Sequence, residues 1–165
     1  MPPLVRRAGR RDLEAIQSLW VRLREEQGKL DPRLAPGPNA ARLEAEHREI
    51  VLADRRTAFF VAEDAGELVG FLHAQIDPND PAYAPERFGT IVDLFVASAC
   101  RGRGIGSRLL EFCKDWLRAS NVSEYRLSTP ANSETARRFF ERRGAAPLRV
   151  VQVASLSESE AEDEQ

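Results

Sequence analysis

The sequence predicts a single α/β (α+β) domain with a mixed central sheet of about six strands, flanked by about four helices. Short β-branched runs alternate along the chain with longer segments whose apolar residues recur at helical spacing. Two neighbouring runs are separated only by the turn at 64–67, and a glycine-rich turn, Arg101 to Gly106, precedes an amphipathic helix. The 165 residues fit one domain, which we expect to span residues 1–156.

The first two helices and the loops beside them are predicted by apolar spacing and by glycine and proline. Asp12 caps a helix whose apolar residues are Leu13, Ile16, Trp20 and Leu23. A second helix has one apolar face, on which we expect His47 to be packed; the face consists of Leu43, His47, Ile50 and Val51. Glycine and proline predict loops at Gln27 to Pro38 and at Asp77 to Phe88.

The expected strands and the remaining helices follow the same two patterns. The strands are Leu4 to Ala8, Thr57 to Glu63, Leu68 to Ile76, Thr90 to Val96, Tyr125 to Thr129 and Leu148 to Ala154. The later helices run from Ile105 to near Asn121 and from Asn132 to Arg143. The acidic residues 157–165 have almost nothing to bury, so we expect a disordered tail.

Composition excludes several classes of protein. The formal net charge of −2 lacks the basic excess of a nucleic-acid-binding domain. No apolar run approaches the roughly 20 residues of a membrane span, and the first residues show no signal peptide. Two cysteines, Cys100 and Cys113, have no metal-ligand neighbours and suggest a reducing compartment. We therefore expect a cytoplasmic protein with no metal, no nucleic acid and no membrane partner.

The turn Arg101-Gly102-Arg103-Gly104-Ile105-Gly106 has the composition of a phosphate cradle. Glycines let the backbone approach a ligand, helix N-terminal N–H groups suit an anion, and arginines add charged donors. A dinucleotide-binding fingerprint would need glycine where Ser107 stands, and a P-loop would need a following Gly-Lys-Ser/Thr. A purely structural turn remains an alternative.

The run from Val92 to Leu110 resembles the acetyl-CoA-binding motif of the GNAT superfamily of N-acetyltransferases, with Arg101, Gly104 and Gly106 at its three defining positions. The segment Asn132 to Gly144 is similar to the family's last helix. The opening strand and the hairpin at 57–76 are also similar, so the resemblance covers residues 4 to 154 in order. Around Asp93 to Val96 and Arg142 to Ala145 the chain is loosely similar to the diamine and polyamine acetyltransferases.

The resemblance implies acetyl-CoA as the donor and an amine as the acceptor, without a covalent enzyme intermediate. It implies a mostly antiparallel sheet, in which the strand ending at Val96 carries a bulge and splays from the next strand. The pantetheine would lie in that gap and the pyrophosphate on the turn. The implied cofactor-binding residues are Leu94, Phe95, Val96, Arg101, Gly102, Arg103, Gly104, Ile105, Gly106, Ser107 and Asn132, with Ser133 in place of Asn132 if no gap is allowed.

The catalytic positions depart from the family pattern. Phe140 stands at the position where the family usually has the tyrosine that acts as the acid. Val92 stands at the position where polyamine acetyltransferases commonly have a glutamate. Asp93 and His73 are the candidates to replace them, each with a structural alternative: a hydrogen-bonded carboxylate and an ordinary strand histidine. Tyr83, in the long loop, is a weaker candidate.

Three functions therefore stay open, and the oligomeric state is an expectation. The first is acetyl transfer to a small amine, a polyamine, an antibiotic or a peptide amine. The second is a catalytically weak acyl-CoA sensor, and the third a nucleic-acid-binding domain that uses the arginines. A single strand after the last helix leaves a sheet edge open, so we expect a homodimer.

Overall fold

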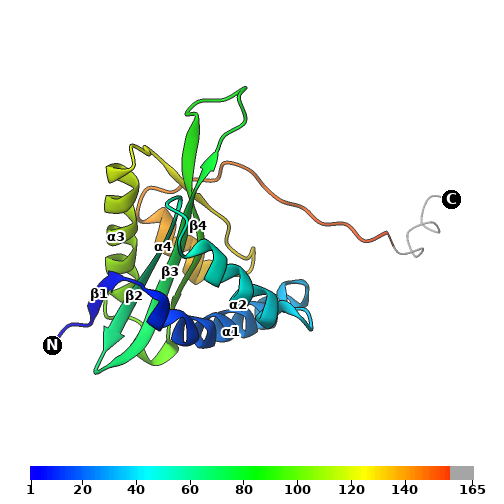
Figure 1. Cartoon of the computed structure of the whole chain (residues 1–165). Helices are drawn as coiled ribbons and strands as arrows, with labels where there is room; N and C mark the ends of the chain where they lie inside the picture. The colour runs from blue at the N-terminus through cyan, green and yellow to red at the C-terminus, as the bar shows by residue number, and fades with distance from the viewer. Residues whose placement is uncertain (157–165) are drawn as a thin grey trace. The chain divides into compact units, whose positions relative to one another are not determined.

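The computed structural model describes residues 1–156 (Figure 1), which fall into two compact units that divide between Ser133 and Glu134. The two units are described separately below. The expected disordered tail, 157–165, lies outside the described residues.

The first unit contains one five-stranded sheet in the order β1-β2-β3-β4-β5. Neighbouring strands are antiparallel from β1 to β4, whereas β5 pairs with β4 in parallel. The strands are β1 Leu4–Arg7, β2 Thr57–Asp64, β3 Glu67–Pro78, β4 Arg87–Val96 and β5 Tyr125–Leu127. The prediction of a mixed, mostly antiparallel sheet is therefore confirmed.

Helices cover both faces of this sheet. α1 (Leu13–Leu30) and α2 (Ala40–Val51) lie on one side, and α3 (Ile105–Ala119) lies on the other (Figure 1). Short 3-10 turns occur at η1 Arg10–Asp12, η2 Pro32–Leu34 and η3 Ser98–Cys100. The fourth helix, α4 (Glu134–Glu141), belongs to the second unit.

Strand alternation divides the buried side chains between the two faces. On the α1 face, one cluster joins α1 to β2, β3 and β4; it contains Ile16, Leu19, Trp20, Leu23, Phe59, Val61, Phe71 and Phe95. On the α3 face, Phe60 meets the ring of Phe112 edge-on at 6.3 Å. Apolar side chains fill both layers, so the helices cannot leave the sheet without exposing them to water.

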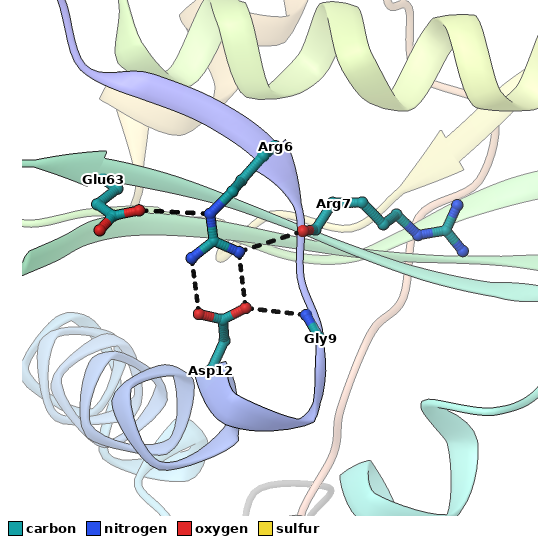
Figure 2. Close-up of polar contacts among 5 residues, drawn as sticks. All are labelled: Arg6, Arg7, Gly9, Asp12 and Glu63. Carbon is teal, nitrogen blue, oxygen red and sulfur yellow. Dashed lines mark hydrogen bonds and ion pairs between the residues drawn. The ribbon is translucent and has the colours of Figure 1, made fainter.

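A charged network fixes the start of α1 against the sheet (Figure 2). Arg6 of β1 donates to both carboxylate oxygens of Asp12 at 2.8 Å and to Glu63 of β2 at 3.3 Å. The Gly9 amide also donates to Asp12, at 2.8 Å. These hydrogen bonds, of which those from Arg6 have the largest effect, hold the pKa of the Asp12 carboxyl below its usual range. Such bidentate pairs fix geometry, so α1 enters the fold in a defined direction.

The apolar face expected for the second helix is wrong at Leu43, His47 and Ile50, whereas Val51 is half-buried and packs against the core. α2 buries Arg48, which exposes 3% of its surface, while Leu43 and Ile50 expose 53% and 75%. His47, expected to be packed, is exposed as well. Arg48 is held at 2.5 Å by Gln17 and lies over the Trp20 ring at 5.9 Å. A guanidinium can be buried when its donors and its flat face are used. In α2 these contacts of Arg48, and not the apolar residues Leu43 and Ile50, determine which face is buried.

Two expected loops are shorter than their proline content predicts. α1 continues through Gly28 to Leu30, and β3 and β4 pair as far as Pro78 and Arg87, inside the loop expected at 77–88. Asp77 stabilises that extension, because it accepts hydrogen bonds from Gln75 at 3.0 Å and Thr90 at 2.6 Å. Cross-strand polar pairs of this kind support a ladder.

The expected strand at 148–154 is absent, so the sheet of the described residues has five strands rather than six. Leu148, Val150 and Val151 expose 66%, 81% and 91% of their surfaces. The β-branched composition favours a strand, but no neighbouring strand pairs with this segment within residues 1–156. No helix in that range is long and apolar enough to cross a membrane.

Candidate active site

The C-terminal half of β4 carries a bulge and loses its neighbour on one side. His73 and Ala74 of β3 pair with Asp93 and Ile91, so Val92 is an extra residue in β4. β5 pairs only with Gly89–Ile91. Between Val92 and Val96, no strand of the described residues lies beside β4 on that edge. The predicted bulge and splay are therefore present.

The bulge also reverses which residues face α1. A side chain built at Gly89 would meet Leu117 of α3 at 2.7 Å, so Gly89 faces α3. Phe95 belongs to the α1 cluster, and Asp93 is bonded to an α1 residue. All three positions are odd-numbered and would share one face in a regular strand. The extra residue turns Asp93 and Phe95 to the opposite face.

β4 continues into the glycine-rich turn, whose backbone is left-handed at two positions. Gly102 and Gly104 have φ of +79° and +77°, and a Cβ at either would meet nothing within 4 Å. Glycine is therefore required by the backbone conformation and not by a neighbouring side chain. Gly104 is the N-cap of α3, and the first amide of the helix bonded to it is that of Arg108, at 3.1 Å.

This turn can hold an anion. The N–H groups of a helix's first turn have no intrahelical partner, and the helix dipole places partial positive charge there. Ile105 is buried and anchors the helix, while the residues from Arg101 to Gly104 are exposed. The residues present therefore fit a pyrophosphate, which would accept hydrogen bonds from the main chain of Gly104 to Gly106.

Both arginines of the turn are engaged by carboxylates from other elements. Arg101 donates from Nε to the Val96 carbonyl at 2.9 Å and from Nη2 to both oxygens of Glu26 on α1, at 3.0 and 2.8 Å. Arg103 donates to Asp64, at the end of β2, at 2.9 Å. The sequence analysis did not identify either acidic partner, because neither lies near the turn in the chain.

Asp93 is a buried carboxylate paired with α1. It exposes 7% of its surface and accepts a hydrogen bond from Arg24 at 2.9 Å. Burial raises the pKa of Asp93 to about 6, against the opposing effect of Arg24. Asp93 is then mostly ionised at pH 7. A carboxylate with this pKa suits proton transfer near neutral pH.

His73 lies opposite Asp93 on β3, within the same face of the sheet. Its ring stacks on Phe59 at 4.1 Å, and its Nε2 is buried with no hydrogen-bond partner. Burial, followed by the charge of Arg48, lowers the pKa of His73 to about 3. The imidazole is therefore neutral at pH 7 and binds a proton weakly.

The remaining candidates are placed differently. Asn132 donates to the Leu30 carbonyl at the end of α1, at 3.1 Å, and the Ser133 amide donates to the Pro130 carbonyl at 2.9 Å. Tyr83 is exposed at the tip of the β3–β4 hairpin. Phe140 belongs to α4 of the second unit, where its ring meets Phe139 edge-on at 5.0 Å. Within residues 1–156 no group of three or more potential ligands is arranged to hold a metal ion.

Arg24 and Arg48 are site residues that the sequence analysis missed. Arg24 bonds Asp93, and its guanidinium lies over Trp20 at 5.2 Å, while Arg48 lies on the other helix over the same ring. The only local signal is their position on helical faces otherwise occupied by apolar residues. That signal is weak, because exposed arginines are common on such helices.

Comparison with known proteins assigns the chain to a family. Residues 14–145 match the family model described as "Acetyltransferase (GNAT) family". The uncharacterized N-acetyltransferase YhfO of Bacillus subtilis is 30% identical over 141 residues, which cover 85% of this chain and 87% of that protein.

Solved structures share the fold. A tetramutant of a Bacillus halodurans protein superposes with a TM-score of 0.81 at 18% identity, covering 93% of this chain and 99% of that one. A predicted acetyltransferase of Clostridium acetobutylicum, solved with acetyl-CoA, superposes with a TM-score of 0.79 at 17% identity, covering 93% and 96%. The chain therefore belongs to the GNAT family of acetyltransferases.

Proposed function

We propose that this protein is an acetyl-CoA-dependent N-acetyltransferase that transfers the acetyl group to a primary amine by direct attack on the thioester. The observation that carries the proposal is the course of β4. It loses β5 after Ile91, continues without a neighbour to Val96 and leads into the glycine-rich turn. An extended donor could add to that edge as a strand does, with its phosphates on the turn. The acetyl-CoA in the Clostridium acetobutylicum structure supports the choice of donor.

The main chain of β4 and of the turn supplies the proposed donor contacts. Leu94, Phe95 and Val96 would bind the pantetheine, and Gly102 to Ser107 the pyrophosphate. The backbone amide that bonds the thioester carbonyl would act as an oxyanion hole, a contribution of about 3–4 kcal/mol in other enzymes. Asn132 and Ser133 complete the proposed set. The side chains of Arg101 and Arg103 would add charged donors to the pyrophosphate.

Asp93 is the proposed base. Alkyl amines have pKa values near 10 and arrive protonated, so attack requires removal of a proton. In the proposed step Asp93 takes one proton from the ammonium group and releases it to water. The amine nitrogen then bonds to the carbonyl carbon, the carbon–sulfur bond breaks, and the second nitrogen proton passes to the regenerated Asp93 carboxylate. His73 is less suited to accept this proton, because the pKa of its imidazole is about 3.

The leaving thiolate takes its proton from water in this scheme. Phe140 occupies the position of the family's tyrosine acid and has no proton to give. A thiol with a pKa near 8.5 can leave as the thiolate, so transfer without a general acid is feasible. The acceptor is proposed only as a class: a small amine, a polyamine, an antibiotic or a peptide amine.

A catalytically weak acyl-CoA sensor is the second candidate, favoured by Phe140 and Val92 at two positions where relatives carry ionisable side chains. The test is release of free CoA thiol from acetyl-CoA with panels of polyamines, aminoglycosides, amino acids and peptides. Release that depends on one amine class supports the enzyme. Tight CoA binding with no turnover on any panel favours the sensor, and no CoA binding refutes both.

We also propose that the protein acts in the cytoplasm as a homodimer. Cys100 and Cys113 are both free thiols, which suits a reducing compartment. The edge strand β5 has three residues, and exposed aliphatic side chains cluster at 148–153. Sedimentation at several protein concentrations tests this: a single monomeric species at every concentration contradicts the dimer.

A further inference from the structure

We propose that Glu26 is an internal competitor of the donor: its carboxylate occupies Arg101 in the free protein and is displaced by the pyrophosphate when CoA binds. This inference rests on the proposed function, since it concerns the same glycine-rich turn. Glu26 takes both of its oxygens to one guanidinium nitrogen of Arg101, at 3.0 and 2.8 Å. A phosphate group would also accept charge-assisted hydrogen bonds from this guanidinium.

The position of Arg101 makes this competition direct. Its Nε is held by the Val96 carbonyl at 2.9 Å, and its guanidinium lies 5.4 Å from the Phe95 ring. The arginine is therefore fixed against the end of β4, where the donor would lie. In the proposed exchange, an anion on the turn takes the Nη2 group that Glu26 holds in the free protein.

Exposure favours exchange over a permanent bond. The side chains of Arg101 and Glu26 expose 46% and 43% of their surfaces. Ion pairs at such exposure contribute little, because water and salt screen them. A dianionic pyrophosphate that also bonds backbone amides can therefore replace one carboxylate. Asp64 stands in the same relation to Arg103, at 2.9 Å, as a second and weaker competitor.

The arrangement has two consequences for the donor site. Each arginine is already ordered before the donor arrives, so binding loses less side-chain entropy. Any anion that uses Arg101 must also displace the Glu26 carboxylate. Glu26 should thus weaken the binding of CoA and of inorganic pyrophosphate alike.

The test compares Glu26→Gln with Glu25→Gln by calorimetric titration of CoA at low salt. Glu25 is the exposed neighbour on α1 and loses the same charge. We expect Glu26→Gln to tighten CoA binding about two- to fivefold, and Glu25→Gln by less than about twofold, by the usual size of exposed ion pairs. Inhibition by inorganic pyrophosphate should increase by a similar factor, because this anion would displace the same carboxylate.

A double-mutant cycle separates competition from a structural role. If Glu26 acts through Arg101, Glu26→Gln should have no effect in an Arg101→Gln background. Weaker CoA binding in Glu26→Gln would instead mean that Glu26 orients Arg101 for the donor, and would overturn the proposal. Equal binding in both glutamine variants would also overturn it, with the proposed function intact. Failure of the unmodified protein to bind CoA would refute the proposed function itself.

Discussion

The glycine-rich turn and the surroundings of Asp93 lie at two ends of one short stretch of β4, yet they are built in different ways. The turn consists of main chain: its left-handed glycines and the first turn of α3 are consecutive residues. Asp93 depends on side chains from other elements, with Arg24 on α1 beside it and His73 on β3 opposite it. A binding site made of consecutive residues can be identified from sequence. A site made by tertiary packing cannot.

The sharpest way to test the packed region is Asp93→Asn. The variant keeps the shape and one acceptor for Arg24 but cannot take a proton, so kcat/KM should fall by about 10²–10⁴-fold. In the unmodified protein the pKa of about 6 for Asp93 places a rise in kcat/KM near pH 6. Below that pH the carboxyl is neutral and cannot act as a base. The rise should vanish in Asp93→Asn.

Asp115→Asn, an exposed change on α3, is the matched control and should leave the pH profile unaltered. CoA affinity should be unchanged in both variants, because neither Asp93 nor Asp115 is among the proposed donor-binding residues. A pH profile in Asp93→Asn that still rises near pH 6 would assign the base to another group.

The turn is tested by Gly104→Val against Gly66→Val. Both glycines have positive φ, +77° and +83°, and a Cβ at either meets nothing within 4 Å. Both variants should therefore lose a similar stability, about 1–2 kcal/mol for a left-handed non-glycine residue. Only Gly104→Val distorts the anion site and should weaken CoA binding at least about 100-fold, by the loss of several charge-assisted bonds.

Melting temperature and CoA titration on the same samples check this pair. Equal loss of CoA affinity in the two variants would mean that strain alone, and not the place of Gly104 in the turn, is responsible. Unchanged CoA affinity in Gly104→Val would remove the turn from the donor site.

The features that could be predicted from the sequence are the local ones, and those that could not are made by tertiary packing. The hairpin around Gly66 and the turn at Gly102 to Gly104 were predicted correctly, because positive φ is a local requirement that glycine satisfies. The face of α2 was predicted wrongly, because the cost of burying Arg48 depends on Gln17 and Trp20 of another helix. The hydropathy pattern of α2 does not reveal partners that lie on another helix.

The strand predictions failed for related reasons. Pro78 marks a loop in sequence, yet the strand pairs through it because bonds from Gln75 and Thr90 to Asp77 support the ladder. Val150 and Val151 favour a strand, yet a strand needs a neighbour to pair with. Ion pairs such as Arg101–Glu26 join residues 75 positions apart, and no local signal predicts them.

A smaller effect is expected where the family acid is missing. Phe140→Tyr supplies a phenol at the position of the usual acid and should raise kcat by at most about tenfold, because a thiol of pKa near 8.5 already leaves without help. Phe139→Tyr adds the same hydroxyl one residue earlier and serves as the control. Steady-state rates at saturating amine compare the two. Equal rates in both variants would show that protonation of the thiolate does not limit turnover.

The smallest expected effect concerns stability. Acidification should change the contributions of the two buried groups, His73 and Asp93, with opposite signs. The pKa of His73 is lowered to about 3, so the unfolded chain takes up a proton first as pH falls below about 6.5, and stability is lost. The pKa of Asp93 is raised to about 6, so between about pH 6 and 4 the folded chain takes up the proton first, and stability is gained. On acidification from pH 7 to 5, the stability lost at His73 and the stability gained at Asp93 therefore oppose each other.

His73→Phe keeps the stack on Phe59 and removes one of these contributions. Without the opposing His73 contribution of about 1–2 kcal/mol, the melting temperature at pH 5, relative to that at pH 7, should be several degrees higher than in the unmodified protein. His47→Gln removes the other histidine, which is exposed, and should leave the difference unaltered. Asp93→Asn should enlarge the difference, because only the loss at His73 then remains. Identical pH dependence in His73→Phe and the unmodified protein would mean that His73 is protonated in the fold, and would restore it as a candidate base beside Asp93.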